Sequence, residues 1–512
     1  MVTNAWKTIQ STMAEIRDLG SVVALLSWDQ ETYMPPKGVT ARAEQLATLQ
    51  GLQHEQLVDP ELGEAIALVD TNPSLTELEQ AQIRELKFER ERATRVPTDL
   101  VKEIARTQAR ALGSWGQARK AQRFELFADD LSHLVELRRA MADAYGAPSG
   151  GERYDALLEG YERGMRVTRL EPLLQTLRDW LVPAVQIISQ HPNPQSQFLE
   201  GHFASNEQWT FATQLLGAMG FDTQAGRLDK SVHPFTTSFD PQDVRITTRI
   251  FENLPLSSVF STIHEAGHAL YEQGLPLSQR RNILCSAASM GLHESQSRLW
   301  ENLVGRSLAF WNAFLPQYQQ LFPQQLGKVL VEQFYAAVNR VCPSLIRVEA
   351  DEVTYNLHVI LRFELELALM RDDLPVREIP GAWNDLCQKL LGVVPSHDTE
   401  GVLQDIHWAW GEFGYFPTYA IGNLYSATLM NAAEREMPEL WPTIGEGKLA
   451  PLREWLNRNV HRWGRTREAE VIVRTSTGKG LNADDFIGYL KRKYEPIFGV
   501  TLPSAPASAA AD

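Results

Sequence analysis

Apolar positions recur every three or four residues along most of the chain, which is the period of an amphipathic helix. The longest such stretch, 77–146, is rich in Glu, Arg, Ala and Leu and predicts two or three helices packed as antiparallel hairpins. Further helices are predicted over 163–190, 206–219, 256–273, 293–314, 325–340 and 348–371. Clusters of Pro and Gly separate these segments, and none is long enough for a domain linker. The pattern therefore predicts a mainly helical protein.

One segment departs from the helical period. Residues 233–251, HPFTTSFDPQDVRITTRIF, contain two short runs of β-branched and aromatic residues around the turn-forming DPQD at 240–243. This arrangement predicts a β-hairpin, which can offer an edge strand to an extended peptide. The last twelve residues, 501–512, are small and polar and predict a disordered tail.

Composition narrows the class of protein. Of the 512 residues, 44% are hydrophobic and 22% charged, as in globular proteins, and the net charge is −15. This charge disfavours nucleic acid or an anionic membrane as the main partner, and no apolar run has the roughly 18 residues of a membrane span. The three cysteines form no CxxC pair, and the first residues do not resemble a secretory signal. We therefore expect a cytoplasmic protein.

The segment 260–274, FSTIHEAGHALYEQG, carries two histidines four positions apart, and a glycine that can cap the helix. On a helix, His264 and His268 share one face and can point ring nitrogens at one metal ion. Glu265 is rotated by about 100° and lies beside the metal, where it can take a proton from a water molecule that the metal acidifies. HExxH fixes only three positions, so the alternative is an ordinary helix with two surface histidines. The apolar residues around the two histidines predict a buried helix, in which Glu265 needs a compensating cation.

A catalytic metal site needs a third ligand. The metzincin pattern, with a histidine six residues after His268, is excluded because that position is glycine. The gluzincin alternative is a glutamate on the following helix, and the segment GLHESQSRLWEN supplies Glu294. Its neighbour His293 is a rival ligand, and Glu301 is a weaker candidate about two helical turns further on. Two histidines and one glutamate form a catalytic zinc arrangement.

The sequences HEAGH at 264–268 and HESQ at 293–296 resemble the carboxypeptidase Taq family of metallocarboxypeptidases. Other segments match the family's motifs in the expected order, namely HPF at 233–235, DVRIT at 243–247, IRVEAD at 346–351 and GVLQDIHW at 401–408. SWDQETYMPPKG at 27–38 is similar to the family's opening hairpin, and TGKGLN and YLKRKY near the C-terminus also fit. The resemblance spans roughly residues 5–500.

This resemblance implies one mostly helical domain over residues 1–500, with a deep substrate groove and a small β-hairpin or sheet near the active site, similar to neurolysin and angiotensin-converting enzyme. It implies a homodimer that removes C-terminal residues from peptides, with broad preference and poor cleavage near proline. Zn²⁺ is the expected cofactor, with Co²⁺ as the other metal used in the family. His264, His268 and Glu294 are then the metal ligands, and Glu265 is the general base and acid.

A carboxypeptidase must bind a free carboxylate, and the planar guanidinium of arginine pairs with two oxygens at once. Arg347 in IRVEAD is the first candidate and Arg245 in DVRIT the second. The alternative for each is an internal salt bridge, to Asp351 or to Asp243. His233 is a candidate for the wall of the groove, although a lone histidine before proline is more often structural.

Peptide hydrolysis also needs hydrogen-bond donors for the developing oxyanion. His407 with Tyr419 resembles the histidine and tyrosine pair of the wider zincin clan, and Tyr415 competes for the tyrosine role. The alternative is that these residues and the aromatic side chains near them (Trp408, Trp410, Phe413, Phe416) simply belong to the hydrophobic core. Gln404 and Asp405 are expected to orient their neighbours, and Asp405 can hold a ring nitrogen of a ligand histidine.

Two other functions fit the same sequence. A metallo-oligopeptidase would use the same site to cut peptides internally. An inactive helical scaffold would bind peptides or a partner protein, but the intact HExxH with its glutamate argues against it. The expected partners are peptides with a free C-terminus, with no role for nucleic acid or membrane.

Overall fold

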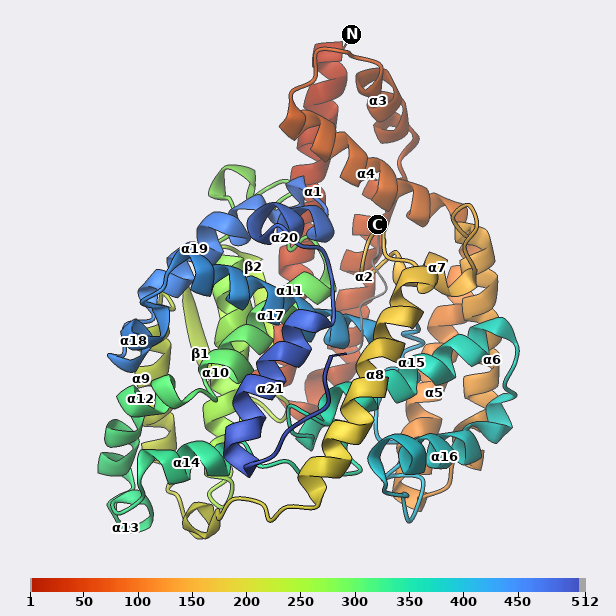
Figure 1. Ribbon diagram of the computed structural model, residues 1–512. Helices are drawn as coiled ribbons and strands as arrows, with labels where there is room; N and C mark the ends of the chain where they lie inside the picture. Colours follow the sequence, from red (N-terminus) through yellow and green to blue (C-terminus); the bar gives the residue numbers. More distant parts are fainter. Residues whose placement is uncertain (1, 506–512) are drawn as a thin grey trace. The chain divides into compact units, whose positions relative to one another are not determined.

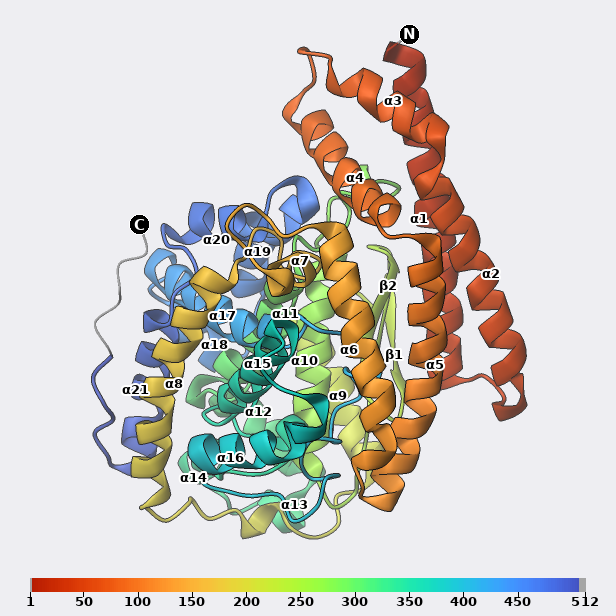
Figure 2. The same ribbon diagram turned by 90° about the vertical axis from the view of Figure 1, so that its right-hand side faces the viewer.

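The computed structural model describes residues 2–505 (Figure 1, Figure 2). Backbone contacts divide the chain into two compact units. The first unit comprises residues up to 94, 195–338 and 428–480, and the second comprises 95–194, 339–427 and the residues from 481 on. Both units are mainly helical, and the first also contains a small sheet. The predicted fold class is therefore confirmed. The single domain and its groove stay predictions.

The first unit is built from helices and three strands. They are α1 (Val2–Thr32), η1 (Pro36–Gly38), α2 (Val39–Val58), α3 (Pro60–Asp70), α4 (Glu77–Arg95, which ends at the unit boundary), η2 (Gln197–Leu199), α9 (Ser205–Met219), β1 (Gly226–Lys230), β2 (Thr236–Asp240), β3 (Asp243–Thr248), α10 (Pro255–Gln273), η3 (Leu277–Gln279), α11 (Met290–Arg298), η4 (Leu299–Val304), α12 (Leu308–Leu321), α13 (Pro323–Leu326), α14 (Val331–Val338), α18 (Leu440–Gly445), α19 (Ala450–Asn459), η7 (His461–Thr466) and α20 (Ala469–Thr477). The segment predicted as an opening hairpin is a helical one, with α2 packed along α1 (Figure 2).

The second unit is helical throughout its described part. Its elements are α5 (Thr98–Ala121), α6 (Glu125–Tyr145), α7 (Arg153–Leu158), α8 (Val167–Ser189), η5 (Arg347–Glu349), α15 (Tyr355–Arg371), η6 (Val376–Glu378), α16 (Ile379–Leu391) and α21 (Asp484–Phe498), and α17 (Pro417–Glu436) crosses the boundary between the units. Helices α5 and α6 run side by side as the predicted hairpin (Figure 2).

The helix predicted over 293–314 is interrupted in the structure. Helix α11 ends at Arg298 and continues as the π-helical turn η4, and α12 begins only at Leu308. Ser307 caps α12, because its hydroxyl accepts a hydrogen bond of 3.1 Å from the backbone N–H of Phe310. The interruption matters for the site, because π turns change the direction in which the following side chains point.

The predicted hairpin is confirmed as β2 and β3, which pair antiparallel across the turn at 240–243. Strand β1, which the sequence pattern did not predict, pairs parallel with β3, so the order is β1-β3-β2 and β2 is an edge strand. The sheet packs on α10 through β2 and β3 (Figure 1). The segment predicted as β therefore lies against the helix that carries HEAGH.

The predicted tail begins with a packed segment. Leu502 is buried, and its carbonyl accepts a hydrogen bond of 2.8 Å from the Lys491 ammonium. Residues 506–512 of the predicted tail lie outside the described part of the chain. Within the described part, no helix combines the length and apolar character needed to cross a membrane.

Candidate metal centre and active-site residues

Helix α10 places the two histidines of HEAGH on one face. Pro255 occupies its first turn, and the backbone N–H of Gly274 closes its end on the carbonyls of Leu270 and Tyr271. The apolar residues between these ends are buried, as the sequence predicted (Val259, Phe260, Ile263, Ala269, Leu270). Their burial fixes the rotation of the helix about its axis, and this fixes the direction of His264 and His268.

Gly267, between the two histidines, allows α11 to approach the backbone of α10. A Cβ atom at this position would lie 2.6 Å from the carbonyl oxygen of Gln296 and 2.7 Å from the Cα of Ser297. Contacts this short are not available to a larger residue, so the close packing of the two helices depends on this glycine. Glu294, one turn before these contacts on α11, is thereby brought to the histidines.

Gly267→Ala is therefore expected to separate the helices and to lower the midpoint of thermal unfolding, because overpacking typically costs about 1–3 kcal/mol. Thermal unfolding and metal titration of the purified variant measure both effects. Gly217→Ala is the matched control, because a Cβ there meets nothing within 4 Å in helix α9. The control should gain about 0.5–1 kcal/mol from its better helix propensity. Equal stability of the two variants would contradict the role given to Gly267.

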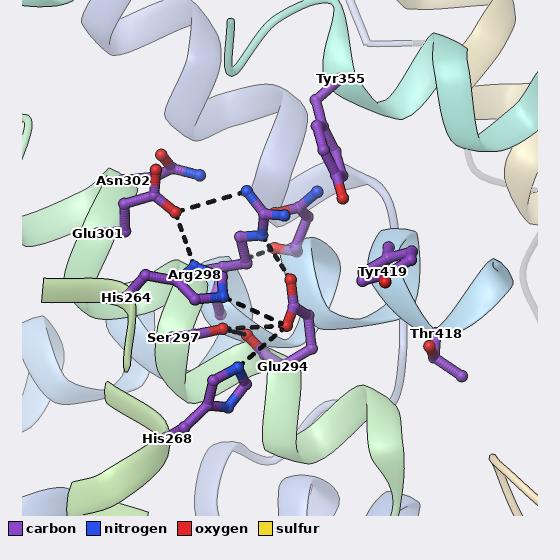
Figure 3. Close-up of polar contacts among 12 residues, drawn as sticks. His264, His268, Glu294, Ser297, Arg298, Glu301, Asn302, Tyr355, Thr418 and Tyr419 are labelled. Atoms are coloured by element: carbon purple, nitrogen blue, oxygen red, sulfur yellow. Dashed lines mark hydrogen bonds and ion pairs between the residues drawn. The ribbon is translucent and has the colours of Figure 1, made fainter. Parts of the chain in front are cut away.

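Three side chains of the first unit form a group that can hold a metal ion. One ligand atom from each of His264, His268 and Glu294 lies within 4.8 Å of the other two. Oε2 of Glu294 is 3.4 Å from Nε2 of His268 and 3.9 Å from Nε2 of His264. Figure 3 shows the three side chains pointing toward one another. Two imidazoles and one carboxylate are the donor set of a catalytic zinc site, so these residues fit a divalent metal.

The surroundings set the charges of these ligands. Burial, and then the neighbouring His293, lower the pKa of His268 to about 3, so its imidazole is neutral, as metal binding requires. Burial alone would raise the pKa of Glu294, but Arg298 and the two ligand histidines hold it well below its ordinary value. Nε of Arg298 donates a hydrogen bond of 2.6 Å to Oε1 of Glu294, which leaves Oε2 facing the histidines (Figure 3).

Glu301, on the π-helical turn η4, holds the first histidine in place. Its Oε2 is 2.9 Å from Nδ1 of His264 (Figure 3). A carboxylate on Nδ1 fixes the tautomer that presents Nε2 to a metal. Sequence analysis had given this orienting role to Asp405 and had considered Glu301 only as a weak ligand. The assignment of this role to Asp405 was wrong, because the carboxylate of Asp405 is held between Arg347 and Arg362.

Glu265 is buried beside the ligand group, and strand β2 fixes its side chain. The hydroxyl of Thr236 donates a hydrogen bond of 2.6 Å to Oε2 of Glu265 and lies 3.0 Å from its carbonyl oxygen. Burial raises the pKa of Glu265 above its ordinary value, against the opposing effects of His264 and Thr236. A raised pKa lies closer to neutral pH, which suits a group that takes and returns a proton.

His293, the rival ligand, is engaged elsewhere. Its Nε2 is 3.0 Å from Oε1 of Glu272, and its ring stacks on that of His268 with the centroids 4.3 Å apart. This contact engages Nε2, and His293 is absent from the group of potential ligands among the described residues. The geometry therefore favours Glu294 over His293 as the third ligand.

In the first unit, Arg245 lies on β3 and His233 lies in the loop between β1 and β2. Arg245 makes a two-point ion pair with Asp243, at 3.0 Å and 3.1 Å, which is the internal salt bridge weighed as the alternative. Its guanidinium also lies over the rings of Trp28 and Phe239, at 4.4 Å and 4.7 Å. The side chain of His233 is exposed.

In the second unit, Arg347 pairs with Asp405. Nη2 and Nε of Arg347 lie 2.7 Å and 3.1 Å from Oδ1 of Asp405, and its Nη1 donates to the hydroxyl of Tyr355 at 2.9 Å. The alternative partner, Asp351, instead accepts hydrogen bonds from the backbone N–H groups of its own loop. The predicted alternative was therefore wrong about the partner, although the arginine does form an internal ion pair.

The carboxylate of Asp405 is shared with a second arginine. Arg362, fully buried on α15, donates to Oδ2 of Asp405 from Nε at 2.6 Å. The two arginines hold the pKa of Asp405 far below its ordinary value, although burial opposes this. One carboxylate thus faces two guanidinium groups, and the cluster keeps one net positive charge.

The loop before α17 contains the predicted histidine and tyrosine pair. Nε2 of His407 is 3.3 Å from the hydroxyl of Tyr419, and the ring of Tyr415 is 5.4 Å from that of His407. Burial, and then the two arginines against the opposing effect of Asp405, lower the pKa of His407 to about 4, so its imidazole is neutral. Gln404 joins this loop to the earlier loop that carries Arg347, because its side chain accepts a hydrogen bond of 2.9 Å from the backbone N–H of Arg347.

The predicted site residues thus form two groups, each within one unit. The first unit holds the potential metal ligands, Glu265, Arg245 and His233, and the second holds Arg347, Gln404, Asp405, His407, Tyr415 and Tyr419. The residues that sequence reasoning missed are those that orient others, namely Thr236, Glu301 in its actual role, and Arg362. A carboxylate near HESQ was the only sequence signal for Glu301, and the other two carried none.

Comparisons with known proteins identify the family of the chain. Residues 8–494 match the sequence model of the carboxypeptidase Taq (M32) metallopeptidases. The chain is 42% identical to thermostable carboxypeptidase 1 of Thermus thermophilus, over 97% of this chain and 99% of that protein. It is 35% identical to carboxypeptidase 1 of Bacillus subtilis, over 95% and 97%. The crystal structure of an M32 carboxypeptidase from Deinococcus radiodurans superposes with a TM-score of 0.95, at 37% identity, and the match covers 97% of this chain and 100% of that one. The chain therefore belongs to the carboxypeptidase Taq (M32) family of metallopeptidases.

Proposed function

We propose that this metal-dependent carboxypeptidase releases amino acids one at a time from the free C-terminus of peptides, with broad preference and poor cleavage next to proline. The observation that carries the proposal is the group of His264, His268 and Glu294 with the buried Glu265 beside it. Membership of the M32 family supports the exopeptidase over other uses of the same ligands.

The proposed metal is Zn²⁺, with Co²⁺ as the other metal that this nitrogen and oxygen donor set accepts. A divalent ion held there polarises the scissile carbonyl and makes water a nucleophile at neutral pH. His264 and His268 would bind it through Nε2, and Glu294 through Oε2. Glu301 would keep His264 in the required tautomer.

Glu265 is proposed as the general base and then the general acid. Its carboxylate takes a proton from the attacking water and later gives a proton to the leaving amine. The hydrogen bond from Thr236 fixes the carboxylate in one rotamer, so the base does not have to be ordered during the reaction.

The residues of the second unit are proposed to act on the substrate. His407 and Tyr419 would donate hydrogen bonds to the developing oxyanion, and their 3.3 Å contact supports a common role. Arg347 would attract the terminal carboxylate, which is supported by the net positive charge that remains when Asp405 pairs with two arginines. Gln404 and Asp405 would hold Arg347 in place.

Three further residues are proposed to line the substrate site. Tyr415 packs near His407, Arg245 lies on β3, and His233 lies in the loop between β1 and β2. The pairing of Arg245 with Asp243 makes it a weaker candidate for the substrate carboxylate than Arg347, because Asp243 leaves no excess positive charge.

The test compares one peptide with a free C-terminus and the same peptide with a C-terminal amide. We expect stepwise loss of single residues from the free peptide, and a loss of at least about 100-fold in kcat/KM for the amide. The amide brings no anion to the net positive charge of the cluster formed by Arg347, Arg362 and Asp405, which costs about 3 kcal/mol. Mass spectra of a timed digest show both results. Internal cleavage of both peptides would instead identify a metallo-oligopeptidase, and no metal-dependent cleavage of either would identify a binding scaffold.

A homodimer and a cytoplasmic location complete the proposal. Helix α2 has no buried residue in the single chain, and its Val39 and Leu52 are 54% and 46% exposed, which supports a surface that a second copy covers. A single-chain mass by light scattering at micromolar concentration would exclude the dimer. The three cysteines are free, which supports a reducing compartment.

A further inference from the structure

A buried carboxylate on α15 binds both ends of the loop segment that carries His407. Glu366 has no exposed surface. Its Oε1 accepts a hydrogen bond of 2.9 Å from the indole N–H of Trp408. Its Oε2 accepts one of 2.8 Å from the hydroxyl of Tyr154 on α7, and one of 3.0 Å from the backbone N–H of Gly414. All four residues belong to the second unit.

Two of these donors, Trp408 and Gly414, lie next to candidate site residues in the sequence. Trp408 directly follows His407, and Gly414 directly precedes Tyr415. The segment between them closes on itself, because the backbone N–H of Glu412 donates to the carbonyl of His407 at 2.9 Å. Glu366 therefore holds a closed turn at both of its ends.

The same turn lies tightly against α7. Gly414 has a φ of +90°, and a Cβ there would lie 3.0 Å from the backbone nitrogen of Leu158. Only glycine allows this approach without strain. The turn is thus fixed by a backbone contact on one side and by the carboxylate of Glu366 on the other.

The carboxylate lowers the stability of the fold at neutral pH. Burial raises the pKa of Glu366 to about 7, although Gly414, Trp408, Tyr154 and, more weakly, Arg362 oppose this. Because the pKa is above its ordinary value, the folded protein loses stability as the pH rises from about 4.5 to about 7. The described residues give Glu366 three neutral donors and no ion pair. The ionised carboxylate is the form that accepts all three hydrogen bonds.

We propose that Glu366 is a positioning residue that fixes the turn bearing His407, so that the imidazole is held ready for the developing oxyanion. This inference rests on the role proposed above for His407. Glu366 acts through Trp408 and Gly414 and takes no part in the chemistry itself.

Glutamine is the informative replacement because it keeps the shape and cannot satisfy all three donors. If its amide nitrogen takes the place of Oε1, it faces the indole N–H of Trp408. If the nitrogen takes the place of Oε2, it faces the N–H of Gly414. In either orientation one N–H group is directed at another, and the turn must move.

The experiment is a double-mutant cycle on kcat with a free-ended peptide. Glu366→Gln is expected to lower kcat by roughly 10- to 100-fold with little change in KM. The reason is that an oxyanion donor stabilises mainly the transition state, so its displacement weakens substrate binding little. In the His407→Ala background the same change should have less than about a twofold effect. An unchanged kcat in Glu366→Gln, or an equal loss with and without His407, would overturn the inference. An unchanged kcat in His407→Ala alone would overturn the role of His407 itself, and the inference with it.

Two further variants separate position from stability. Glu352→Gln is the control, because Glu352 is also buried and accepts hydrogen bonds from three side chains (Tyr489, Lys493, Tyr494), one of them charged, and none of these three partners belongs to the turn. It should lower the thermal midpoint and leave kcat within about twofold of the parent. A loss of kcat equal to that of Glu366→Gln would show a general effect of buried acids and overturn the inference. Should Glu366→Gln fail to fold, Trp408→Phe removes one of the three donors and should lower kcat severalfold; an unchanged kcat there would also overturn it.

Discussion

Replacing Glu265 by glutamine is expected to lower kcat by about 10³- to 10⁴-fold, while the protein still binds its metal. The amide has nearly the shape of the carboxylate, and its oxygen can still accept the hydrogen bond from Thr236. It cannot take a proton from water. Because Glu265 is not among the three potential ligands, its charge is not needed to hold the ion. The loss should therefore appear in turnover and leave KM within a few-fold of the parent value.

Steady-state kinetics and elemental analysis of the same preparation check this result. Glu272→Gln is the control, because Glu272 is a second carboxylate on α10 and pairs with His293. We expect the control to keep its metal and most of its turnover. Near-normal activity of Glu265→Gln would remove Glu265 from the role of base.

Glu294→Ala is expected to abolish stoichiometric metal binding, and activity with it. The variant loses the one anion of the potential ligand group. Arg298, which keeps its 3.5 Å contact with Glu301, then lies beside the two histidines without the carboxylate of Glu294, and its charge would repel the ion. The fall in affinity should exceed the 10- to 100-fold that is typical when only an outer partner of a ligand is removed. Isothermal titration with Zn²⁺ and Co²⁺ measures the affinity and shows which ion binds more tightly.

His293→Gln is the control for this ligand assignment. His293 precedes Glu294 in the sequence and was the rival ligand, but its Nε2 pairs with Glu272. The control should bind one metal ion per chain. If His293→Gln lost the ion and Glu294→Ala kept it, the third ligand would have to be reassigned.

The parts of the site that could be predicted from sequence depend on local spacing. The four-residue separation of His264 and His268 needs only an α-helix, and α10 covers Pro255–Gln273 where a helix over 256–273 was expected. The hairpin likewise depends on alternating residues around one turn, and its strands lie where the pattern put them. These features need no knowledge of distant contacts.

The remaining parts depend on contacts between distant segments. Arg347 pairs with Asp405, 58 positions away, where the sequence suggested Asp351 only four positions away. Strand β1 was missed because its partner in the sheet is β3, beyond the intervening β2. Glu301 was misjudged because a regular helix was assumed, whereas the turn that carries it is π-helical. Such pairings leave no periodic signal in a single sequence.

The contact at Gly267 has a consequence for how the enzyme responds to chelators. Close backbone packing of α10 on α11 brings the three potential ligands together. The site is therefore preorganised, and loading it requires little loss of conformational entropy. Small zinc domains behave in the opposite way and unfold when stripped of metal. Chelation should thus inactivate this enzyme reversibly and leave its far-ultraviolet circular dichroism unchanged.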